Sequence, residues 1–336
     1  MLHQIDAAAT AAAPTFDDVR EAARTLAGLA VRTPLLESPA LNERVGGRVL
    51  LKAETLQRTG SFKFRGAYNR ISRIPERDRA GGVVAYSSGN HAQGVAAAAA
   101  LLRLPAVIVM PSDAPAIKVA NTRGYGAEVV FYDRFTESRE EIGAAIAVER
   151  GATLVRPYDD GGVIAGQGTC GLEVIEQAGQ LGAVLDAMLV CCGGGGLTAG
   201  CALAFEALSP QTKIFAVEPA GYDDTRLSLE AGRPLPHGNT TNSICDALLS
   251  PRPGDVTFAV NRTRVQAGLS VTDDEVKAAM RYAFRTLKLV VEPGGAVCLA
   301  AVLAGKAEAA GRVTGLTLSG GNVDAELYRA ILAADD

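Results

Sequence analysis

Residues 188–207 read MLVCCGGGGLTAGCALAFEA, an apolar run followed by four glycines and then an alanine-rich run. The apolar run Met188–Cys192 predicts a buried strand, and Thr198–Ala207 predicts the helix after it. Consecutive glycines are costly in conformational entropy, so they favour a backbone that wraps closely around a ligand. Because N–H groups at a helix start bind anions, we expect a phosphate here; the alternative is a flexible turn. The spacing fits neither GxGxxG with a following acidic residue nor GxxxxGK[ST], which argues against dinucleotides and nucleoside triphosphates.

The same alternation of apolar, β-branched runs and alanine-rich runs extends along most of the chain. Strands are expected at 49–51, 83–86, 106–110, 128–132, 153–155, 188–192, 214–217 and 315–318, and helices at 17–30, 91–102, 138–150, 171–177 and 198–207. Strands that alternate with helices predict an α/β fold with mostly parallel sheets. The apolar runs are nearly continuous, as in strands that helices cover on both faces.

Four of the expected strands lie between residues 82 and 157. We therefore predict two domains, each a mostly parallel sheet covered by helices. Residues 15–78 and 158–334 form the large domain, and residues 82–157 form a small domain inserted into it. The cleft between them is the expected ligand site, and residues 1–14 are interpreted as a flexible leader.

The composition narrows the classes of function. The 336 residues carry a formal net charge of −4 without a recurring basic stripe, so nucleic acid is not an expected partner. No apolar run has the length needed to cross a bilayer, so no membrane association is expected. The six cysteines lack metal-binding spacing, which predicts free thiols in a reducing compartment, the cytoplasm.

A second motif, SFKFRGA at residues 61–67, opens a predicted helix with Lys63. The positive end of the helix dipole disfavours a charged lysine, and a lowered pKa would leave the free amine that a Schiff-base nucleophile needs. The alternative is an ordinary solvated lysine on the surface.

Two more motifs follow predicted strands. In YSSGNHAQG, residues 86–94, a strand runs through small and polar residues into a helix, which favours an anion site for a carboxylate or phosphate. Simple helix capping by Ser88 or Asn90 is the alternative. In LSGGN, residues 318–322, a hydroxyl ends the last strand, where α/β sheets place ligand contacts; a turn with a helix cap is the alternative there.

One cofactor accounts for all four motifs. Pyridoxal 5′-phosphate (PLP) has an aldehyde for a lysine, a phosphate for a glycine loop and a ring nitrogen that needs a polar partner. In order and spacing, the motifs resemble the fold type II PLP family of threonine/serine dehydratases and serine racemase. The resemblance extends from about Leu36 to Asp324 and includes AGQGT at 165–169 and VEPGGA at 291–296. It implies β-elimination from a β-hydroxy amino acid, such as serine or threonine, to a 2-oxo acid and ammonia. We also expect a homodimer.

The resemblance implies roles for individual residues. Lys63 would form the Schiff base, Phe62 would pack against the ring, Asn90 would bind the ring hydroxyl, and Ser319 would face the ring nitrogen with Glu292 nearby. A serine there makes the ring a weaker electron sink, which suits β-elimination. The phosphate would lie against Gly193, Gly194, Gly195, Gly196 and Leu197.

The substrate residues follow from the same resemblance. Its carboxylate would lie against Ser87, Ser88, Asn90 and His91. Arg139 is a further candidate, although a charge on a helix surface explains it equally well, and Asp246 would lie near the substrate hydroxyl. Ser88 is also a candidate catalytic acid or base on the face opposite Lys63.

The segment EPAGYDD, residues 218–224, follows a predicted strand and gathers carboxylates with an exposed carbonyl, which suits a hard divalent cation. A polar loop is the alternative. The resemblance supports Glu218, Asp224 and the Tyr222 carbonyl as ligands of Mg²⁺ or Ca²⁺.

Two departures leave the substrate open. Arg156 stands where the family often has histidine, and Ala247 follows Asp246 where glycine is common. The alternatives are an amino-acid racemase of the serine type and a dehydratase of 3-hydroxyaspartate or of a hydroxyectoine-derived amino acid. The match at Asp246 and the cation loop weigh against β-replacement, and the retained lysine weighs against a silent binding protein. No regulatory domain follows the catalytic part, so catabolism is expected rather than feedback-controlled synthesis.

Overall fold

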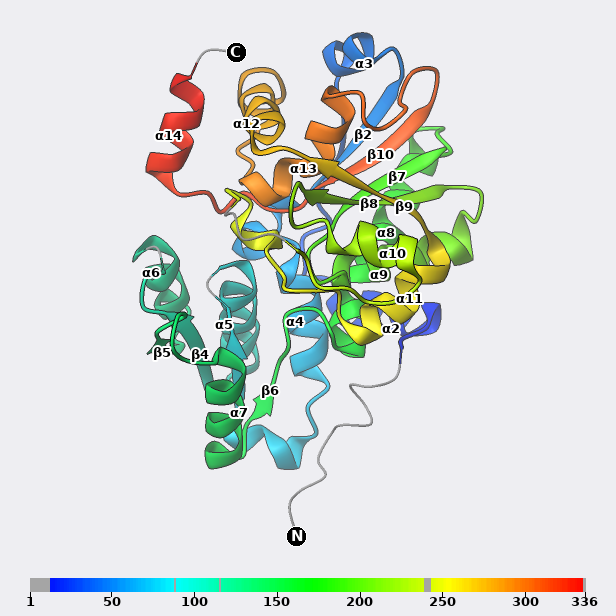
Figure 1. Ribbon diagram of the computed structural model, residues 1–336. Helices are drawn as coiled ribbons and strands as arrows, with labels where there is room; N and C mark the ends of the chain where they lie inside the picture. The colour runs from blue at the N-terminus through cyan, green and yellow to red at the C-terminus, as the bar shows by residue number, and fades with distance from the viewer. Residues whose placement is uncertain (1–12, 88, 115, 239–242, 335–336) are drawn as a thin grey trace.

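The computed structural model describes residues 13–87, 89–114, 116–238 and 243–334. Two sheets organise these residues (Figure 1). The larger sheet has the strand order β1-β2-β10-β7-β8-β9, and the smaller has the order β5-β4-β3-β6. Every pairing is parallel except that of β1 with β2. The strands are β1 (Leu35–Glu37), β2 (Arg48–Ala53), β3 (Val83–Tyr86), β4 (Ala106–Pro111), β5 (Glu128–Tyr132), β6 (Thr153–Leu154), β7 (Ala187–Cys191), β8 (Lys213–Pro219), β9 (Val265–Val271) and β10 (Val313–Leu318).

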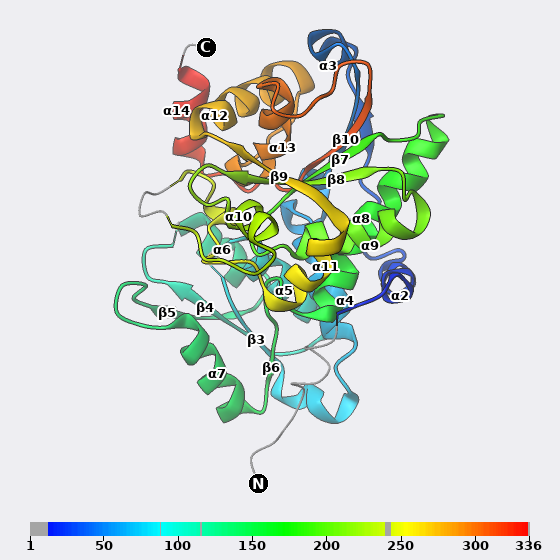
Figure 2. The same ribbon diagram turned by 45° about the vertical axis from the view of Figure 1, so that its right-hand side comes forward.

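Helices cover both sheets. In Figure 2 the large sheet lies between α13 and α12 on one side and α8, α9 and α11 on the other. The small sheet packs against α5 and α7. The helices are α2 (Phe16–Leu26), α3 (Pro39–Val45), α4 (Lys63–Ser72), α5 (Asn90–Leu102), α6 (Ala116–Gly124), α7 (Arg139–Arg150), α8 (Gly161–Gln180), α9 (Gly196–Leu208), α10 (Asp224–Ala231), α11 (Asp255–Arg264), α12 (Asp273–Tyr282), α13 (Pro293–Leu303) and α14 (Ala325–Ala333), with short turns η1 (Glu54–Leu56), η2 (Arg58–Gly60), η3 (Glu76–Gly81), η4 (Asp246–Leu248) and η5 (Ala283–Leu287).

The predicted fold class is confirmed: the chain is an α/β protein with two mostly parallel sheets covered by helices. Two strands were not predicted. β1 spans only Leu35–Glu37, and β9, with the sequence VQAGLSV, lacks a continuous apolar run. The first helix ends at Leu26 rather than residue 30. Among the described residues, no helix is long and apolar enough to cross a membrane.

The helix expected from Gly171 begins at Gly161 instead. Asp160 caps this start, since its carboxylate accepts a hydrogen bond from the Val163 N–H at 2.9 Å. The glycines in the first half of this helix are needed for close packing. A Cβ atom on Gly168 would lie 2.7 Å from the Gly200 carbonyl oxygen on α9, and one on Gly166 would lie 2.6 Å from the Arg65 carbonyl oxygen on α4. α8 therefore contacts the backbones of both neighbouring helices.

A cluster of buried charged side chains also links α4 to α8. The Arg65 guanidinium, fully buried, donates to both oxygens of Glu54 at 2.8 Å and to the carboxylate of Glu173 on α8 at 2.7 and 2.8 Å. Lys52 donates to Glu173 at 2.6 Å. Removing one member would leave an uncompensated buried charge, which is strongly destabilising, so the start of α4 is held firmly.

The α8 packing predicts a large difference between two glycine-to-alanine substitutions on one helix. Gly168→Ala should lower the free energy of unfolding by about 1–3 kcal/mol, because its methyl group forces α8 away from α9. Gly179→Ala is the matched control: nothing lies within 4 Å of its Cβ position, so it should be neutral or stabilise by up to about 1 kcal/mol. Denaturant unfolding measures both, and equal effects would refute the packing argument.

Candidate active site

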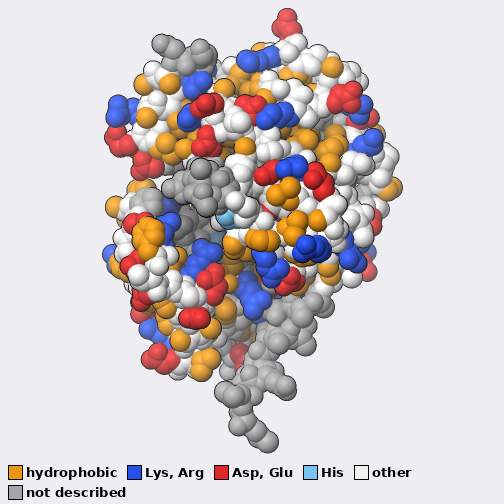
Figure 3. All heavy atoms as spheres, in the orientation of Figure 1, with side chains coloured by type: hydrophobic (Ala, Val, Ile, Leu, Met, Phe, Trp, Pro, Cys, Tyr) orange, Lys and Arg blue, Asp and Glu red, His pale blue; other side chains and the backbone are white. Residues whose placement is uncertain are grey.

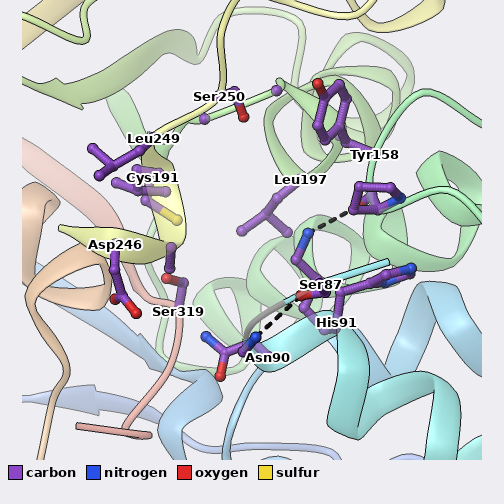
Figure 4. Close-up of a pocket in the computed structure, with 18 of the residues that line it drawn as sticks. Ser87, Asn90, His91, Tyr158, Cys191, Leu197, Asp246, Leu249, Ser250 and Ser319 are labelled. Atoms are coloured by element: carbon purple, nitrogen blue, oxygen red, sulfur yellow. Dashed lines mark hydrogen bonds between the residues drawn. The ribbon is translucent and has the colours of Figure 1, made fainter. Parts of the chain in front are cut away.

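A cavity lies where strands of the two sheets end. The predicted residues that line it are Phe62, Lys63, Ser87, Asn90, His91, Arg139, Gly193, Gly194, Gly195, Gly196, Leu197, Asp246, Glu292 and Ser319. Figure 4 shows several of these side chains converging from separate segments, and basic side chains gather beside the hollow on the face in Figure 3. Ser88 lies outside the described residues. The structure thus brings together most of the predicted site, whereas the roles of the residues stay predictions.

Lys63 is the first residue of α4 and points into the cavity. Its ammonium donates to the Pro157 carbonyl oxygen at 2.8 Å, and its Nζ atom lies 5.2 Å from the centre of the Phe62 ring. Burial lowers the pKa of Lys63 to about 8, while Cys191 and Glu292 oppose the shift. A substantial fraction of the amine is therefore neutral near physiological pH, as a Schiff-base nucleophile requires.

The glycine loop joins β7 to α9. Gly195 has a φ of 92°, a left-handed conformation that favours glycine. From α11, the Thr257 hydroxyl donates to the Gly194 carbonyl at 2.7 Å, and the Asn261 amide donates to the Gly195 carbonyl at 3.3 Å. A Cβ on Gly194 would lie 2.3 Å from the Tyr158 ring. Close packing against Tyr158 is therefore one reason for a glycine at position 194. The expected binding of a phosphate is a second, independent reason.

Asn90 and Glu292 form a polar network on one side of the cavity. The Asn90 amide donates to the Glu292 carboxylate at 2.5 Å, and the Asn322 amide donates to the Asn90 side-chain carbonyl at 2.7 Å. Burial, with a smaller contribution from Asp246, raises the pKa of Glu292 to about 7. Glu292 is therefore partly protonated at neutral pH and adds less than a full negative charge to the cavity.

Ser319 follows β10 and faces the same cavity. Its backbone carbonyl accepts a hydrogen bond from the Phe62 N–H at 3.1 Å. This bond links the end of the large sheet to the start of α4, so that Ser319 and Lys63 keep a constant relative position.

The predicted carboxylate loop runs from β3 into α5. The Ser87 hydroxyl accepts from the Gly89 N–H at 3.2 Å, and a His91 ring nitrogen, Nε2, pairs with the Val155 carbonyl at 2.9 Å. Burial, and then the charge of Lys63, lowers the pKa of His91 to about 3. His91 is consequently neutral, so a carboxylate bound here depends on hydrogen-bond donors rather than on an imidazolium.

Two basic side chains line the cavity besides Lys63. Arg139, at the start of α7, lies with its guanidinium 5.5 Å from the centre of the Tyr86 ring and pairs with Glu140 at 2.9 Å. Lys118, from α6, forms an ion pair with Asp246 at 2.5 Å. Sequence reasoning missed Lys118, because a lysine within the helical segment AIKVANTRG carries no signal that separates it from a surface charge.

The predicted cation ligands lie apart from this cavity, where β8 leads into α10: Glu218 is near the end of β8, Tyr222 is in the connecting loop, and Asp224 begins α10. The Glu218 carboxylate accepts from the N–H groups of Thr225 and Arg226, each at 2.9 Å. Both carboxylate oxygens of Asp224 are buried and lack a hydrogen-bond partner among the described residues. Burial raises the pKa of Asp224 to about 7, and burial together with Asp224 raises that of Glu218. Two adjacent buried acids of raised pKa fit a cation site, although the described residues contain no cluster of three or more His, Cys, Asp or Glu side chains.

Residues 26–320 match the family model described as "Pyridoxal-phosphate dependent enzyme". The chain belongs to this family. Among curated proteins, it is 45% identical over 323 residues to L-threo-3-hydroxyaspartate ammonia-lyase of Saccharomyces cerevisiae, covering 96% of this chain and 98% of that protein. Its identity to serine racemase of Schizosaccharomyces pombe is 40% over 320 residues, covering 95% and 98%. Among solved structures, maize serine racemase superposes with a TM-score of 0.89 at 39% identity, covering 95% of this chain and 97% of that one.

The cavity of this PLP enzyme fits the cofactor. A buried amine of lowered pKa, a glycine loop at a helix start and a hydroxyl at the end of β10 are the donors and acceptors that its aldehyde, phosphate and ring nitrogen need. The large sheet supplies the glycine loop and Ser319, and α4 supplies Lys63.

The lowered pKa of Lys63 predicts the pH dependence of cofactor capture. Only the neutral amine attacks the aldehyde, so the rate at which cofactor-free protein captures PLP should rise with pH through about 8 and then level off. A solvated lysine, with a pKa of about 10.4, would give a rate that keeps rising well above pH 9. Stopped-flow absorbance measures this rate, and Lys63→Ala is the control that should capture no cofactor covalently.

Proposed function

We propose that this chain is a PLP-dependent ammonia-lyase that eliminates water from a β-hydroxy amino acid and yields a 2-oxo acid and ammonia. The observation that carries the proposal is Lys63, a buried amine with a pKa of about 8 in the same cavity as Ser319. The names of relatives support it, since two ammonia-lyases for L-threo-3-hydroxyaspartate share 45% and 48% identity with the chain.

When bound, the cofactor draws electrons away from the α-carbon of the amino acid and so acidifies its α-hydrogen. Lys63 would serve as the base, because its neutral Nζ atom in the cavity could take the α-proton of a bound substrate. Loss of the β-hydroxyl as water needs one proton from a neighbouring group. The resulting enamine becomes an imine in solution, and hydrolysis of the imine consumes one water and releases ammonia.

The remaining cavity residues have positioning roles in this proposal. Gly193–Leu197 would hold the phosphate, Phe62 would pack on the ring, and Ser319 would meet the ring nitrogen. A neutral serine does not hold that nitrogen protonated as a carboxylate would. With Ser319 at this position, the bound cofactor would supply a weaker electron sink, which would favour loss of a β-hydroxyl over a long-lived carbanion.

The loop at 87–91 would bind the α-carboxylate through its hydrogen-bond donors, with Asn90 also reaching the ring hydroxyl. Asp246 would lie near the substrate hydroxyl. Racemisation is a second candidate activity, favoured by the 40% identity to a serine racemase. Its predicted acid or base, Ser88, lies outside the described residues.

A substrate panel tests the reaction. Purified holoenzyme given serine, threonine and 3-hydroxyaspartate should form ammonia and 2-oxo acid from at least one of them. Lys63→Ala should lose the cofactor absorbance and reduce turnover by about 10²–10⁴-fold or more, since the base is gone. Chiral chromatography of the remaining amino acid separates the candidates: interconversion of enantiomers much faster than 2-oxo acid formation would establish the racemase instead.

We also propose a divalent cation, Mg²⁺ or Ca²⁺, bound by Glu218, Asp224 and the Tyr222 carbonyl. The raised pKa values of the two buried acids support this proposal, because a hard cation between them would offset both the burial and the repulsion.

Cation binding should depend on pH with a definite sign. Because the pKa of Asp224 is raised to about 7 in the folded protein without metal, its contribution to stability is present below the unfolded value of about 3.9 and is lost as the pH rises through 7. Saturating Mg²⁺ or Ca²⁺ should therefore raise Tm more at pH 8 than at pH 5. Asp224→Asn should abolish this rise while leaving the chelated protein at least as stable as chelated wild type. No cation effect at either pH would refute the site.

Three broader proposals stand beside the reaction. The domain division into 15–78 with 158–334 and an inserted 82–157 is supported by the two sheets, since β3, β4, β5 and β6 form one of them. The six cysteines are free and buried, which supports a reducing compartment such as the cytoplasm. The homodimer stays a prediction.

A further inference from the structure

The ion pair between Lys118 and Asp246 joins two separate parts of the cavity wall. Lys118 comes from α6, beside the small sheet, and Asp246 comes from η4, in the connection between strands β8 and β9 of the large sheet. The Lys118 Nζ atom lies 2.5 Å from the Asp246 carboxylate, and both side chains line the cavity. Figure 4 shows Asp246 directed into the region that Asn90 and Ser319 also border.

The two partners differ sharply in their exposure to solvent. The Lys118 side chain is 8% exposed, whereas that of Asp246 is 48% exposed. A buried ammonium without an anion is costly, but a half-exposed carboxylate that leaves its partner regains water. Lys118 therefore requires an anion at all times, whereas Asp246 is replaceable.

The position of Lys118 relative to the carboxylate loop is informative. Its Nζ atom lies 3.6 Å from the place that a Cβ on Gly89 would occupy, so it borders the loop that would hold the substrate. Arg139, with a side chain 34% exposed, lines the same cavity. The pocket is thus lined by two basic side chains, Lys118 and Arg139, besides Lys63.

A substrate with a single carboxylate offers no second anion to these cations, which then stay paired with Asp246 and Glu140. In the proposed function, its carboxylate meets the loop at 87–91, and its amine meets the cofactor. A serine or threonine then offers only a hydroxyl or methyl group, neither of which neutralises a cation. A substrate with a second carboxylate on its β-carbon supplies the anion that Lys118 needs.

We propose that Lys118 selects β-hydroxy amino acids that carry a second carboxylate, and that this carboxylate displaces Asp246 from Lys118 when the substrate binds. The inference rests on the proposed lyase function and deepens it by assigning the substrate class and the residue that recognises it. Arg139 is a second partner for the same carboxylate. Asp246 forms the ion pair with Lys118 as long as no substrate is bound.

If the second carboxylate replaces Asp246 at Lys118, substitutions of Lys118 and Asp246 should change the use of 3-hydroxyaspartate in opposite directions. Lys118→Gln removes the cation, so kcat/KM for 3-hydroxyaspartate should fall at least about tenfold, as expected for a lost charge-assisted hydrogen bond. Its kcat/KM for serine should change less than about threefold. Asp246→Asn removes the competitor, so the KM for 3-hydroxyaspartate should fall below the wild-type value. Arg123→Gln, which removes an equal charge from the exposed face of α6, is the matched control and should change neither substrate.

A binding measurement avoids turnover altogether. Malate, a dicarboxylate without an amine, is titrated into each holoenzyme while thermal stability is followed, with lactate as the monocarboxylate control. Malate should raise the Tm of Asp246→Asn more than that of wild type, because Lys118 lacks its partner in that variant. It should raise the Tm of Lys118→Gln least, and lactate should not distinguish the three proteins.

The outcomes separate this inference from the lyase proposal. If Lys118→Gln lowers kcat/KM for serine and for 3-hydroxyaspartate equally, Lys118 binds the α-carboxylate or only stabilises the cavity wall. The inference then fails, while the lyase function stands. If Asp246→Asn raises the KM for 3-hydroxyaspartate and malate stabilises all variants alike, there is no exchange of carboxylates. If wild type deaminates no member of the panel, the lyase proposal fails, and the malate titration still decides whether Lys118 binds a second carboxylate.

Discussion

The backbone contact of α8 with two neighbouring helices is the constraint on which the site depends. Lys63 begins α4, the glycine loop leads into α9, and α8 packs against both helices. Because Gly166 and Gly168 let these helices approach without intervening side chains, the distance between the amine and the phosphate loop is set by backbone atoms rather than by flexible side chains. The Arg65 cluster reinforces the same contact, since it joins α4 to α8 through Glu173.

Burial governs the chemistry of the ionisable groups. It lowers the pKa of Lys63 and His91 and raises that of Glu292, so each of these groups carries less charge than it would in water. The amine becomes a competent base, the imidazole becomes a neutral neighbour, and the carboxylate becomes a partial hydrogen-bond donor. Lys118 is different, because an ion pair with Asp246 compensates its burial. An ion-paired lysine in a cavity where burial reduces the charge of its neighbours is a means of choosing among substrates.

The segment proposed to bind a cation is connected to the glycine loop through a short path of contacts. Thr225, whose N–H donates to Glu218, also contacts the Cys192 sulfur at 3.3 Å through its hydroxyl. Cys192 directly precedes the first glycine of the loop. The buried acids are therefore linked to the loop that follows β7, so a cation bound between them, as proposed, would be coupled to the glycine loop through these contacts.

The sequence by itself determined the fold class, the order of most strands and of some of the helices between them, and the motifs that converge on the cavity. These features are encoded locally, in continuous apolar runs, a run of glycines and a lysine before a helix. It did not determine which groups are buried together, because burial depends on segments far apart in the chain. Only the tertiary structure decided that the glycines of α8 serve close packing against α4 and α9, that Tyr158 demands glycine at 194, and that Lys118, in the first turn of α6, lines the cavity.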